Sequence, residues 1–207
     1  MTQDKFKATT SANPLLIVIS GFSGVGKDAT LDKMKKAGFP FHYVVTATTR
    51  QKRPGEKDRV DYHFLSEGKF LQMIKTNQFL EWAMVYDNYY GVPRQEIEEA
   101  LRKGQDTIVK VDVQGAATIK KILPDAVFIF LTAPSTEELA NRLRKRHSAH
   151  PSDLDLRLSK AQEEVESLPL FDYVVVSHTD NLDLTVTQIN DIITAEKCRS
   201  KPRVVKL

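Results

Sequence analysis

One stretch near the start of this 207-residue chain decides its fold: residues 15–28 read LLIVISGFSGVGKD. Residues 15–20 form a largely apolar run, which is typical of a strand buried on both faces of a parallel sheet. Residues 21–27 then fit the first seven positions of the pattern G-x-x-x-x-G-K-S/T. Glycines in such a loop let several backbone N–H groups face one anion, and the following helix directs its positive end to the same place. The stretch therefore predicts a phosphate-binding loop, in which Lys27 supplies a mobile charge for the β- and γ-phosphates of a nucleotide.

The eighth position of this loop departs from the pattern, because Asp28 stands where a Ser or Thr hydroxyl usually contacts Mg²⁺. A carboxylate could bind the ion directly or through water, since Mg²⁺ prefers oxygen ligands. Asp28 also suits the first turn of a helix, beside the positive end of the helix dipole. The sequence leaves both roles open.

Composition and charge describe an ordinary globular chain, with 41% apolar and 28% charged residues. Lys and Arg number 30 against 27 Asp and Glu, and the formal net charge of +3 does not indicate a nucleic-acid partner. No apolar run approaches the roughly 18 residues of a membrane-spanning helix. Cys198 is the only cysteine, which excludes an internal disulfide, and His147 with His150 lack an obvious third metal ligand. We therefore expect a cytoplasmic protein with no membrane and no nucleic-acid partner.

Strand and helix signals alternate along most of the chain. Strands are expected at residues 42–46, 79–85, 107–113, 126–131 and 173–176, and helices at 67–77, 93–104, 116–123 and 182–195. Ser135 and Glu138 have the spacing of a capping box that opens a further helix. This alternation predicts a three-layer α/β fold with a mostly parallel sheet. The charged, tyrosine-rich stretch 48–90 has short strands and is expected to form a lobe inserted into the main sheet.

The inserted stretch carries a second set of candidate binding residues. Arg50 and Arg53 are close enough to clamp one phosphate, and Tyr62 and Tyr90 could each donate a hydroxyl to it. Glu81 lies in an apolar segment, where a carboxylate is costly unless it is paired, and the N1–H and N2–H₂ donors of guanine would pair it. Taken singly, each residue has an alternative: solvated surface arginines, a water-facing Glu81 and core tyrosines.

Several spaced motifs, in this order behind the phosphate loop, resemble the guanylate kinase family. They are T-x-T-T-R-x-x-R-P-G-E from Thr46, V-D-Y-H-F from Val60, F-L-E-W from Phe79, N-Y-Y-G from Asn88 and V-D-V-Q-G-A from Val111. The resemblance runs from about residue 15 to residue 195. It implies transfer of the γ-phosphoryl group of ATP to GMP, and to dGMP, giving ADP and GDP with Mg²⁺. ATP and GMP are then the partners, and the chain is expected to be a monomer or a homodimer.

The resemblance also implies the organisation of the chain. A P-loop kinase core with a parallel sheet is expected to carry an inserted GMP-binding lobe and a helical lid. Residues 1–14 are then a flexible leader, 15–196 the kinase domain and 197–207 a basic tail. Within the domain we expect the core at 15–45, 93–138 and 168–196, the GMP-binding lobe at 46–92 and the lid at 139–167.

Carried over by position, the resemblance assigns a role to each site residue. Thr46 and Glu81 match the guanine-reading positions, Glu56 braces the arginines, and Asp112 lies near the base and the metal. The full GMP set is Thr46, Arg50, Arg53, Glu56, Tyr62, Glu81, Tyr90 and Asp112. The ATP set is Gly21, Phe22, Ser23, Gly24, Val25, Gly26, Lys27, Asp28 and Ala29, and the metal candidates are Asp28 and, through water, Asp112.

Four residues are expected to act on the transferred group. They are Lys27 and three arginines that match the phosphate-contacting arginines of the family's lid, Arg142, Arg146 and Arg157. Phosphoryl transfer needs neutralised charge and aligned oxygens more than covalent help. Arginines on a lid arrive when both nucleotides are bound, which also excludes water.

The chain departs from the family pattern at several positions near the site. Val92 stands where a Thr or Ser usually helps to read guanine, and Lys110 stands where an acid is common. Arg59 replaces a frequent Gly, and Ser177-His178 replaces an Asn-Asp pair near the adenine side. None of these changes removes a phosphate ligand, but the loss of a hydroxyl at Val92 could relax the choice of base.

Three other functions remain to be compared with GMP phosphorylation. The first is a non-catalytic guanylate-kinase-like interaction module, against which the intact loop residues Gly24, Gly26 and Lys27 argue. The second is a related kinase with another phosphorylated acceptor. The third is nucleic-acid binding through the basic tail.

Overall fold

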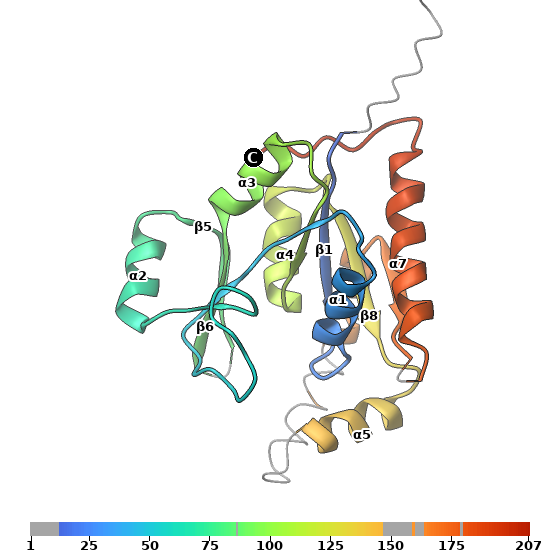
Figure 1. The fold of residues 1–207 in the computed structure, drawn as a ribbon, viewed down its shortest axis with the longest axis horizontal. Coiled ribbons are helices and arrows are strands. Elements are labelled where there is room, and N and C mark those ends of the chain that lie inside the picture. The colour runs from blue at the N-terminus through green and yellow to red at the C-terminus, as the bar shows by residue number, and fades with distance from the viewer. Residues whose placement is uncertain (1–12, 86, 147–158, 160–163, 179) are drawn as a thin grey trace, which may run out of the picture.

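The computed structural model describes residues 13–85, 87–146, 159, 164–178 and 180–207. Within these residues, five strands form a parallel sheet in the order β2-β7-β1-β8-β9. Figure 1 shows two of them, β1 and β8, side by side. Its strands are β1 (Leu16–Gly21), β2 (His42–Tyr43), β7 (Thr107–Lys110), β8 (Val127–Thr132) and β9 (Tyr173–Val176). The phosphate loop therefore follows the central strand of the sheet.

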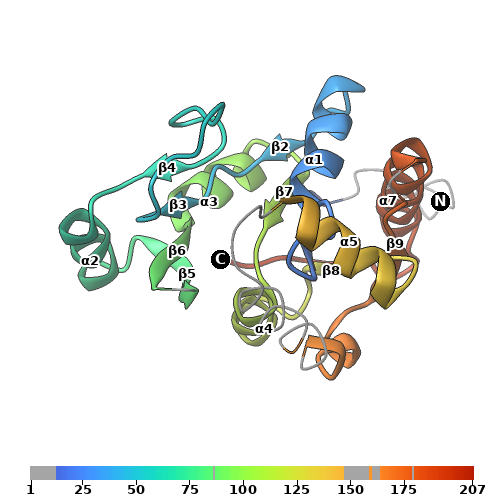
Figure 2. The same ribbon diagram turned by 90° about the horizontal axis from the view of Figure 1, so that it is seen from below.

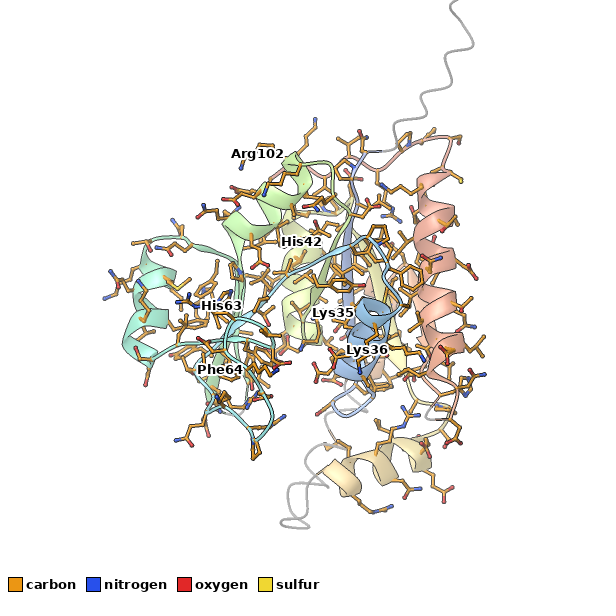
Figure 3. The ribbon with its side chains drawn as sticks, in the orientation of Figure 1. Lys35, Lys36, His42, His63, Phe64 and Arg102 are labelled. Carbon is orange, nitrogen blue, oxygen red and sulfur yellow. The ribbon has the colours of Figure 1, made fainter. Side chains whose placement is uncertain are left out.

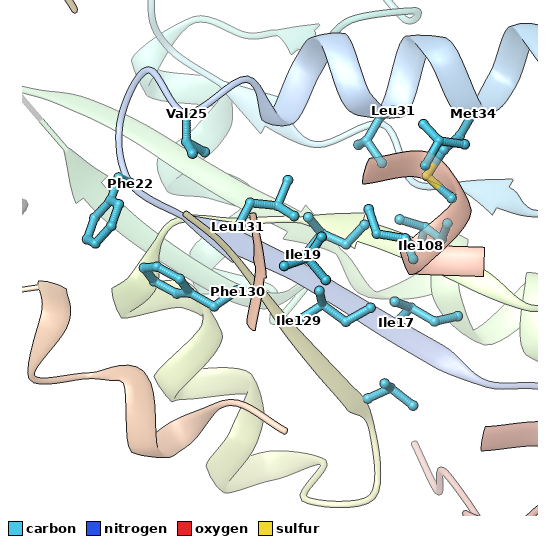
Figure 4. Close-up of a cluster of buried hydrophobic side chains, with 14 of the residues drawn as sticks. Ile17, Ile19, Phe22, Val25, Leu31, Met34, Ile108, Ile129, Phe130 and Leu131 are labelled. Carbon is cyan, nitrogen blue, oxygen red and sulfur yellow. The ribbon is translucent and has the colours of Figure 1, made fainter. Parts of the chain in front are cut away.

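Helices cover both faces of the sheet because both faces of β1 are apolar. On one face, Ile17 and Ile19 pack with α1 (Lys27–Lys36) and α7 (Leu182–Lys197), in the cluster drawn in Figure 4. On the other face, Leu16 and Val18 pack with α3 (Arg94–Arg102) and α4 (Val113–Ile122). The view from below shows α1 and α4 on opposite sides of the sheet (Figure 2). The predicted three-layer α/β fold is confirmed.

A second sheet stands beside the first, with the strand order β4-β3-β6-β5 among the described residues. Its strands are β3 (Ala47–Thr48), β4 (His63–Phe64), β5 (Phe79–Val85) and β6 (Asn88–Pro93), and α2 (Glu67–Lys75) packs on it. Phe70 of α2 stacks on Phe79 with ring centres 4.4 Å apart. Gly91 lies under these rings, where an added Cβ would meet Phe79 at 2.8 Å and Phe70 at 2.9 Å. Only a glycine fits there without displacing the small apolar core of this sheet.

Glu96 of α3 links the two sheets. Its carboxylate contacts His42 of β2 at 3.0 Å and also lies 4.0 Å from His63 of β4. Figure 3 labels both histidines, one from each sheet. The backbone N–H of Val45, between the two sheets in sequence, donates to the same carboxylate at 3.1 Å. One side chain thus fixes where the chain passes from the parallel sheet into the second sheet.

Some element boundaries differ from the sequence-based expectation. The strand expected at 107–113 ends at Lys110, and the helix expected from residue 116 begins at Val113. The reason is Asp112, whose side chain accepts a hydrogen bond from the N–H of Gly115 at 2.7 Å. This is an N-cap, which satisfies a backbone donor that the first helical turn leaves unpaired. The strand predictions at 79–85 and 173–176 are confirmed residue for residue.

The basic segment after α7 packs onto the core through Arg203. Its guanidinium donates to the nearly fully buried carboxylate of Glu196 at 2.7 Å and to the carbonyl of Ala126 at 3.0 Å. The hydroxyl of Tyr173 donates to the same carboxylate at 2.6 Å. Burial raises the cost of the Glu196 charge, but Arg203 and Tyr173 outweigh it and lower the pKa of Glu196.

Two further expectations concern the ends of the chain and membranes. Residues 1–12 of the expected leader lie outside the described part of the chain. Across the part that is described, no helix has the length and apolar character needed to cross a bilayer.

Candidate active site

The carboxyl end of the parallel sheet and the second sheet enclose one cavity of about 390 Å³. Parallel α/β sheets bind ligands at this end, where loops leave the strands. The cavity brings together residues from the phosphate loop, the second sheet and the strand end after β7. Of the expected site residues it is lined by Gly21, Ser23, Gly24, Lys27, Asp28, Thr46, Arg50, Arg53, Tyr62, Glu81, Tyr90 and Asp112.

The other described site residues do not line the cavity. Phe22 and Val25 belong to the buried core, where the Phe22 ring meets Phe130 edge-on at 4.9 Å. Gly26, Ala29, Glu56 and Arg142 are also not among the residues that line the cavity in the described part of the chain. Contact of Phe22, Val25, Gly26 and Ala29 with ATP remains a prediction.

The loop holds Lys27 over its own carbonyls. The ammonium donates to Gly21 O at 2.5 Å and to Phe22 O at 3.1 Å. Gly24 and Gly26 have φ angles of 80° and 104°, which glycine adopts at little cost. Burial lowers the pKa of Lys27 to about 8, although Glu164 and Asp28 act in the opposite direction. A phosphate anion in the cavity would favour the charged ammonium and so bind strongly there.

Arg50 is fixed before any ligand arrives. Its guanidinium forms a two-pronged pair with the carboxylate of Glu56, at 2.8 and 3.0 Å, and Glu56 also accepts from the backbone N–H of Arg53 at 2.7 Å. Burial disfavours the charge on Arg50, but Glu56 outweighs it and raises the pKa. The Tyr62 and Tyr90 rings meet edge-on at 6.2 Å beside it. The geometry fits the bracing role expected of Glu56 and presents one anion-binding clamp.

Glu81 is the buried carboxyl of the site. It is 6% exposed, and its Oε2 has no hydrogen-bond partner among the described residues. Burial, with a smaller contribution from Asp112, raises the pKa of Glu81 to about 8. Gly115 of α4 faces it closely, since an added Cβ there would lie 2.9 Å from Oε2. A buried acceptor without a partner is costly, and a ligand with adjacent N–H donors would satisfy it.

The acids near the loop offer little to a metal ion by themselves. Among the described residues, no group of three or more His, Cys, Asp or Glu side chains could hold a metal. Asp28 pairs with Lys110, whose ammonium also donates to the Tyr62 hydroxyl at 3.0 Å. Asp112 caps α4 with one carboxylate oxygen and lines the cavity. Such a donor set suits Mg²⁺ that arrives with nucleotide phosphates and keeps its waters.

Of the three arginines expected in the lid, the structure describes the side chain of Arg142 alone. Arg142 lies on α5 (Thr136–Arg146) and donates to the carbonyls of Val25 at 2.9 Å and Ser177 at 2.7 Å. It therefore braces the back of the phosphate loop in this structure. Arg146 ends α5, and its side chain lies outside the described part of the chain, as does Arg157. Contact of these arginines with phosphate remains a prediction.

Lys110 and Gly115 also shape the site, and neither is among the expected ligands. Lys110 was seen only as a departure from the family pattern, and its signal was a cation at the end of a core strand, close in sequence to Asp112. Gly115 carried no local signal, because its role depends on the approach of Glu81 from another element. Val92, another departure from the family pattern, is 1% exposed and packs in the core with Leu80 instead of lining the cavity.

A phosphate loop that shares one cavity with an arginine clamp and a buried carboxyl defines a P-loop kinase for a phosphorylated, base-bearing acceptor. Comparison with known proteins identifies the family. The family model described as guanylate kinase matches residues 13–196, so the chain belongs to the guanylate kinase family.

Relatives of known name agree with this assignment. The chain is 46% identical over 195 residues to "Guanylate kinase 2, chloroplastic/mitochondrial" of Oryza sativa subsp. japonica, covering 94% of this chain and 68% of that protein. It is 40% identical over 187 residues to the guanylate kinase of Carboxydothermus hydrogenoformans, covering 90% and 91%. The crystal structure of guanylate kinase from Anaplasma phagocytophilum matches with a TM-score of 0.73 and 29% identity, covering 92% of this chain and 89% of that one.

Proposed function

We propose that this chain transfers the γ-phosphoryl group of ATP to GMP, and to dGMP, giving ADP and GDP in purine nucleotide metabolism. The observation that carries the proposal is the buried Glu81 carboxyl in the same cavity as Lys27. Glu81 is an unsatisfied acceptor that matches the N1–H and N2–H₂ donors of guanine. Lys27 is the lysine of the phosphate loop. Family membership supports the same activity.

The lobe at residues 46–92 would hold GMP. Arg50 and Arg53, with the hydroxyls of Tyr62 and Tyr90, bind its phosphate, while Glu81 and Thr46 read the base. All six residues line the cavity. The pair between Arg50 and Glu56 orders the clamp in advance, so that binding costs less side-chain entropy.

The loop at residues 21–29 would hold ATP, with Lys27 at the β- and γ-phosphates. The pKa of Lys27 is about 8 in the free protein, so a phosphate that binds beside its ammonium would favour full protonation. A lid at 139–167 would then close, and Arg142 would stiffen the loop through Val25 O. Arg146 and Arg157 would neutralise the group in transfer, as the family resemblance implies.

Mg²⁺ is the metal that this chemistry uses, and it neutralises the phosphate oxygens when bound. Asp112 would help to hold it, through water, when it arrives with the nucleotide. Asp112 suits this because its carboxylate lines the cavity and keeps one oxygen beyond its N-cap bond. Asp28 is less suited because its Oδ1 accepts from the ammonium of Lys110, whose positive charge would repel a cation at this carboxylate.

The test is a coupled assay of ADP formation from ATP with Mg²⁺ and one acceptor at a time: GMP, dGMP, AMP, UMP or a sugar phosphate. GMP should give the highest kcat/KM. A better rate with another acceptor would show that the substrate assignment is wrong. No turnover with any acceptor, together with retained GMP binding, would favour the interaction module.

A further inference from the structure

Lys110 and Asp28, two charged departures from the expected pattern, meet inside the cavity. The ammonium of Lys110 donates to Asp28 Oδ1 and, at 3.0 Å, to the hydroxyl of Tyr62. It also lies 4.5 Å from the centre of the Tyr62 ring. Asp28 belongs to the phosphate loop and Tyr62 to the second-sheet lobe, so Lys110 stands at the junction between the two halves of the cavity.

The ammonium is held in a nearly dry position. Its side chain is 16% exposed, and removing a charge from water is costly unless an anion compensates. Asp28 supplies that anion, and the hydroxyl of Tyr62 accepts a second hydrogen bond from the same ammonium. The ammonium is therefore paired and held in place in the structure without a ligand.

The bonding of Lys110 leaves capacity for a ligand. An ammonium carries three N–H donors, and hydrogen bonds to described residues use two of them, at Asp28 and Tyr62. Lys110 lines the cavity between Lys27 and the arginine clamp. The ammonium of Lys110 already contacts the Tyr62 hydroxyl. A phosphate bound to that hydroxyl would therefore lie within reach of the ammonium.

We propose that Lys110 is a further catalytic residue of this chain: its ammonium contacts the phosphate of the acceptor nucleotide, and Asp28 serves by holding Lys110 in place. The inference rests on the proposed function. During transfer, an oxygen of the acceptor phosphate forms the new bond to the γ-phosphorus while the bond to the β–γ bridging oxygen breaks and ADP leaves. No bond to Lys110 is made or broken. Its charge reduces the repulsion between the two phosphates as they approach.

The test compares Lys110→Met with the matched control Lys120→Met. Lys120 also pairs with a carboxylate, Asp172 at 3.1 Å, and lies over a ring, Phe128 at 4.3 Å, but it does not line the cavity. GMP affinity is measured by calorimetry without ATP, followed by kcat, both KM values and Tm. Lys110→Met should weaken GMP binding about tenfold and lower kcat about a hundredfold, because a charge-assisted contact is lost. The affinity for a non-hydrolysable ATP analogue should change less than about threefold, and Lys120→Met should leave GMP binding and kcat unchanged.

Two backgrounds separate direct contact from positioning. In Tyr62→Phe, the further change Lys110→Met should still cost about tenfold in GMP affinity; no further loss would show that Lys110 acts only through Tyr62. Asp28→Asn should lower kcat much less in the Lys110→Met background than in the unaltered chain, because Asp28 is proposed to act through Lys110; an equal loss in both backgrounds would show that Asp28 acts independently of Lys110. If Lys110→Met does not fold, Lys110→Arg tests the same contact, because it keeps the positive charge. Lys110→Arg should retain most of the GMP affinity. Loss of that affinity in a folded Lys110→Arg would count against the proposed contact with phosphate.

The two levels of the proposal fail differently. If the unaltered chain does not phosphorylate GMP, the proposed function is wrong. If it does, and Lys110→Met keeps GMP affinity and kcat within about threefold, only the role of Lys110 is overturned.

Discussion

The unpaired carboxyl of Glu81 predicts that GMP binding depends on pH. Burial and Asp112 raise its pKa to about 8 in the free protein. Guanine offers N1–H and N2–H₂ donors, which need the ionised carboxylate as acceptor. Below pH 8, GMP must therefore bind to a minor form of the protein, and each binding event must release the proton of Glu81.

The size of the effect follows from that pKa. About one tenth of the Glu81 carboxyls are ionised at pH 7 and about three quarters at pH 8.5. The affinity for GMP should rise by their ratio, about eightfold, over this range. A phosphate monoester has its second pKa near 6, so the GMP phosphate stays a dianion throughout and does not produce the change.

Calorimetry of GMP binding without ATP measures both quantities. At pH 7, titrations in two buffers of different ionisation enthalpy should show release of about 0.9 proton per GMP. Glu81→Gln is the control: it should bind GMP more weakly, because its amide NH₂ meets the guanine donors, and should lose this pH dependence. A wild-type affinity that is flat from pH 7 to 8.5, with no proton release, would refute an ionised Glu81 as the guanine acceptor.

Further predictions concern catalysis, packing and stability. Lys27→Ala should lower kcat by at least about a hundredfold while Tm, measured by circular dichroism, changes little, because the ammonium donates to two carbonyls of its own loop and is costly to bury. Gly115→Ala should raise the KM for GMP but not for ATP in the coupled assay, because the new Cβ would lie 2.9 Å from Glu81 Oε2. The folded-state pKa of Glu81 lies above the ordinary 4.5, so its carboxyl lowers stability increasingly between pH 4.5 and about 8; Glu81→Gln should therefore exceed the wild type in Tm by more at pH 8.5 than at pH 5. Arg203→Met should reduce the free energy of unfolding in urea by about 3 kcal/mol, because the buried Glu196 loses its main partner.

The parts of the fold that follow from local patterns were predictable. The apolar run before Gly21 gives the central strand because a strand buried on both faces has no polar alternation. The glycine pattern fixes the turn after it, and Lys27 then begins α1. The strand at 79–85 could be placed for the same reason, and its single acid, Glu81, could be suspected because an isolated carboxyl in an apolar run is costly.

Other features depend on contacts between distant parts of the chain and leave no local trace. The basic residues after Lys197 suggest a solvated tail, but Arg203 pairs with a carboxylate that the last helix buries. The sequence pattern around Asp112 indicates the end of a strand. In the structure Asp112 is the N-cap of α4, so this helix begins at Val113, earlier than the expected residue 116. Arg142 has the spacing of a solvated helix face, yet it meets the carbonyl of Val25, 117 positions away in sequence.

The charges of the cavity explain why a net charge of +3 is compatible with a site for two polyanions. Arg50 is balanced by Glu56 and Lys110 by Asp28, so these cations are already ordered and compensated when the site is free of ligand. Lys27 differs, because burial lowers its pKa to about 8 and so leaves its charge less firmly fixed than theirs. About nine tenths of the Lys27 amines are protonated at pH 7, and a bound phosphate would favour protonation of the remainder. The paired cations supply fixed geometry for one phosphate, and Lys27 supplies a charge that responds to the other.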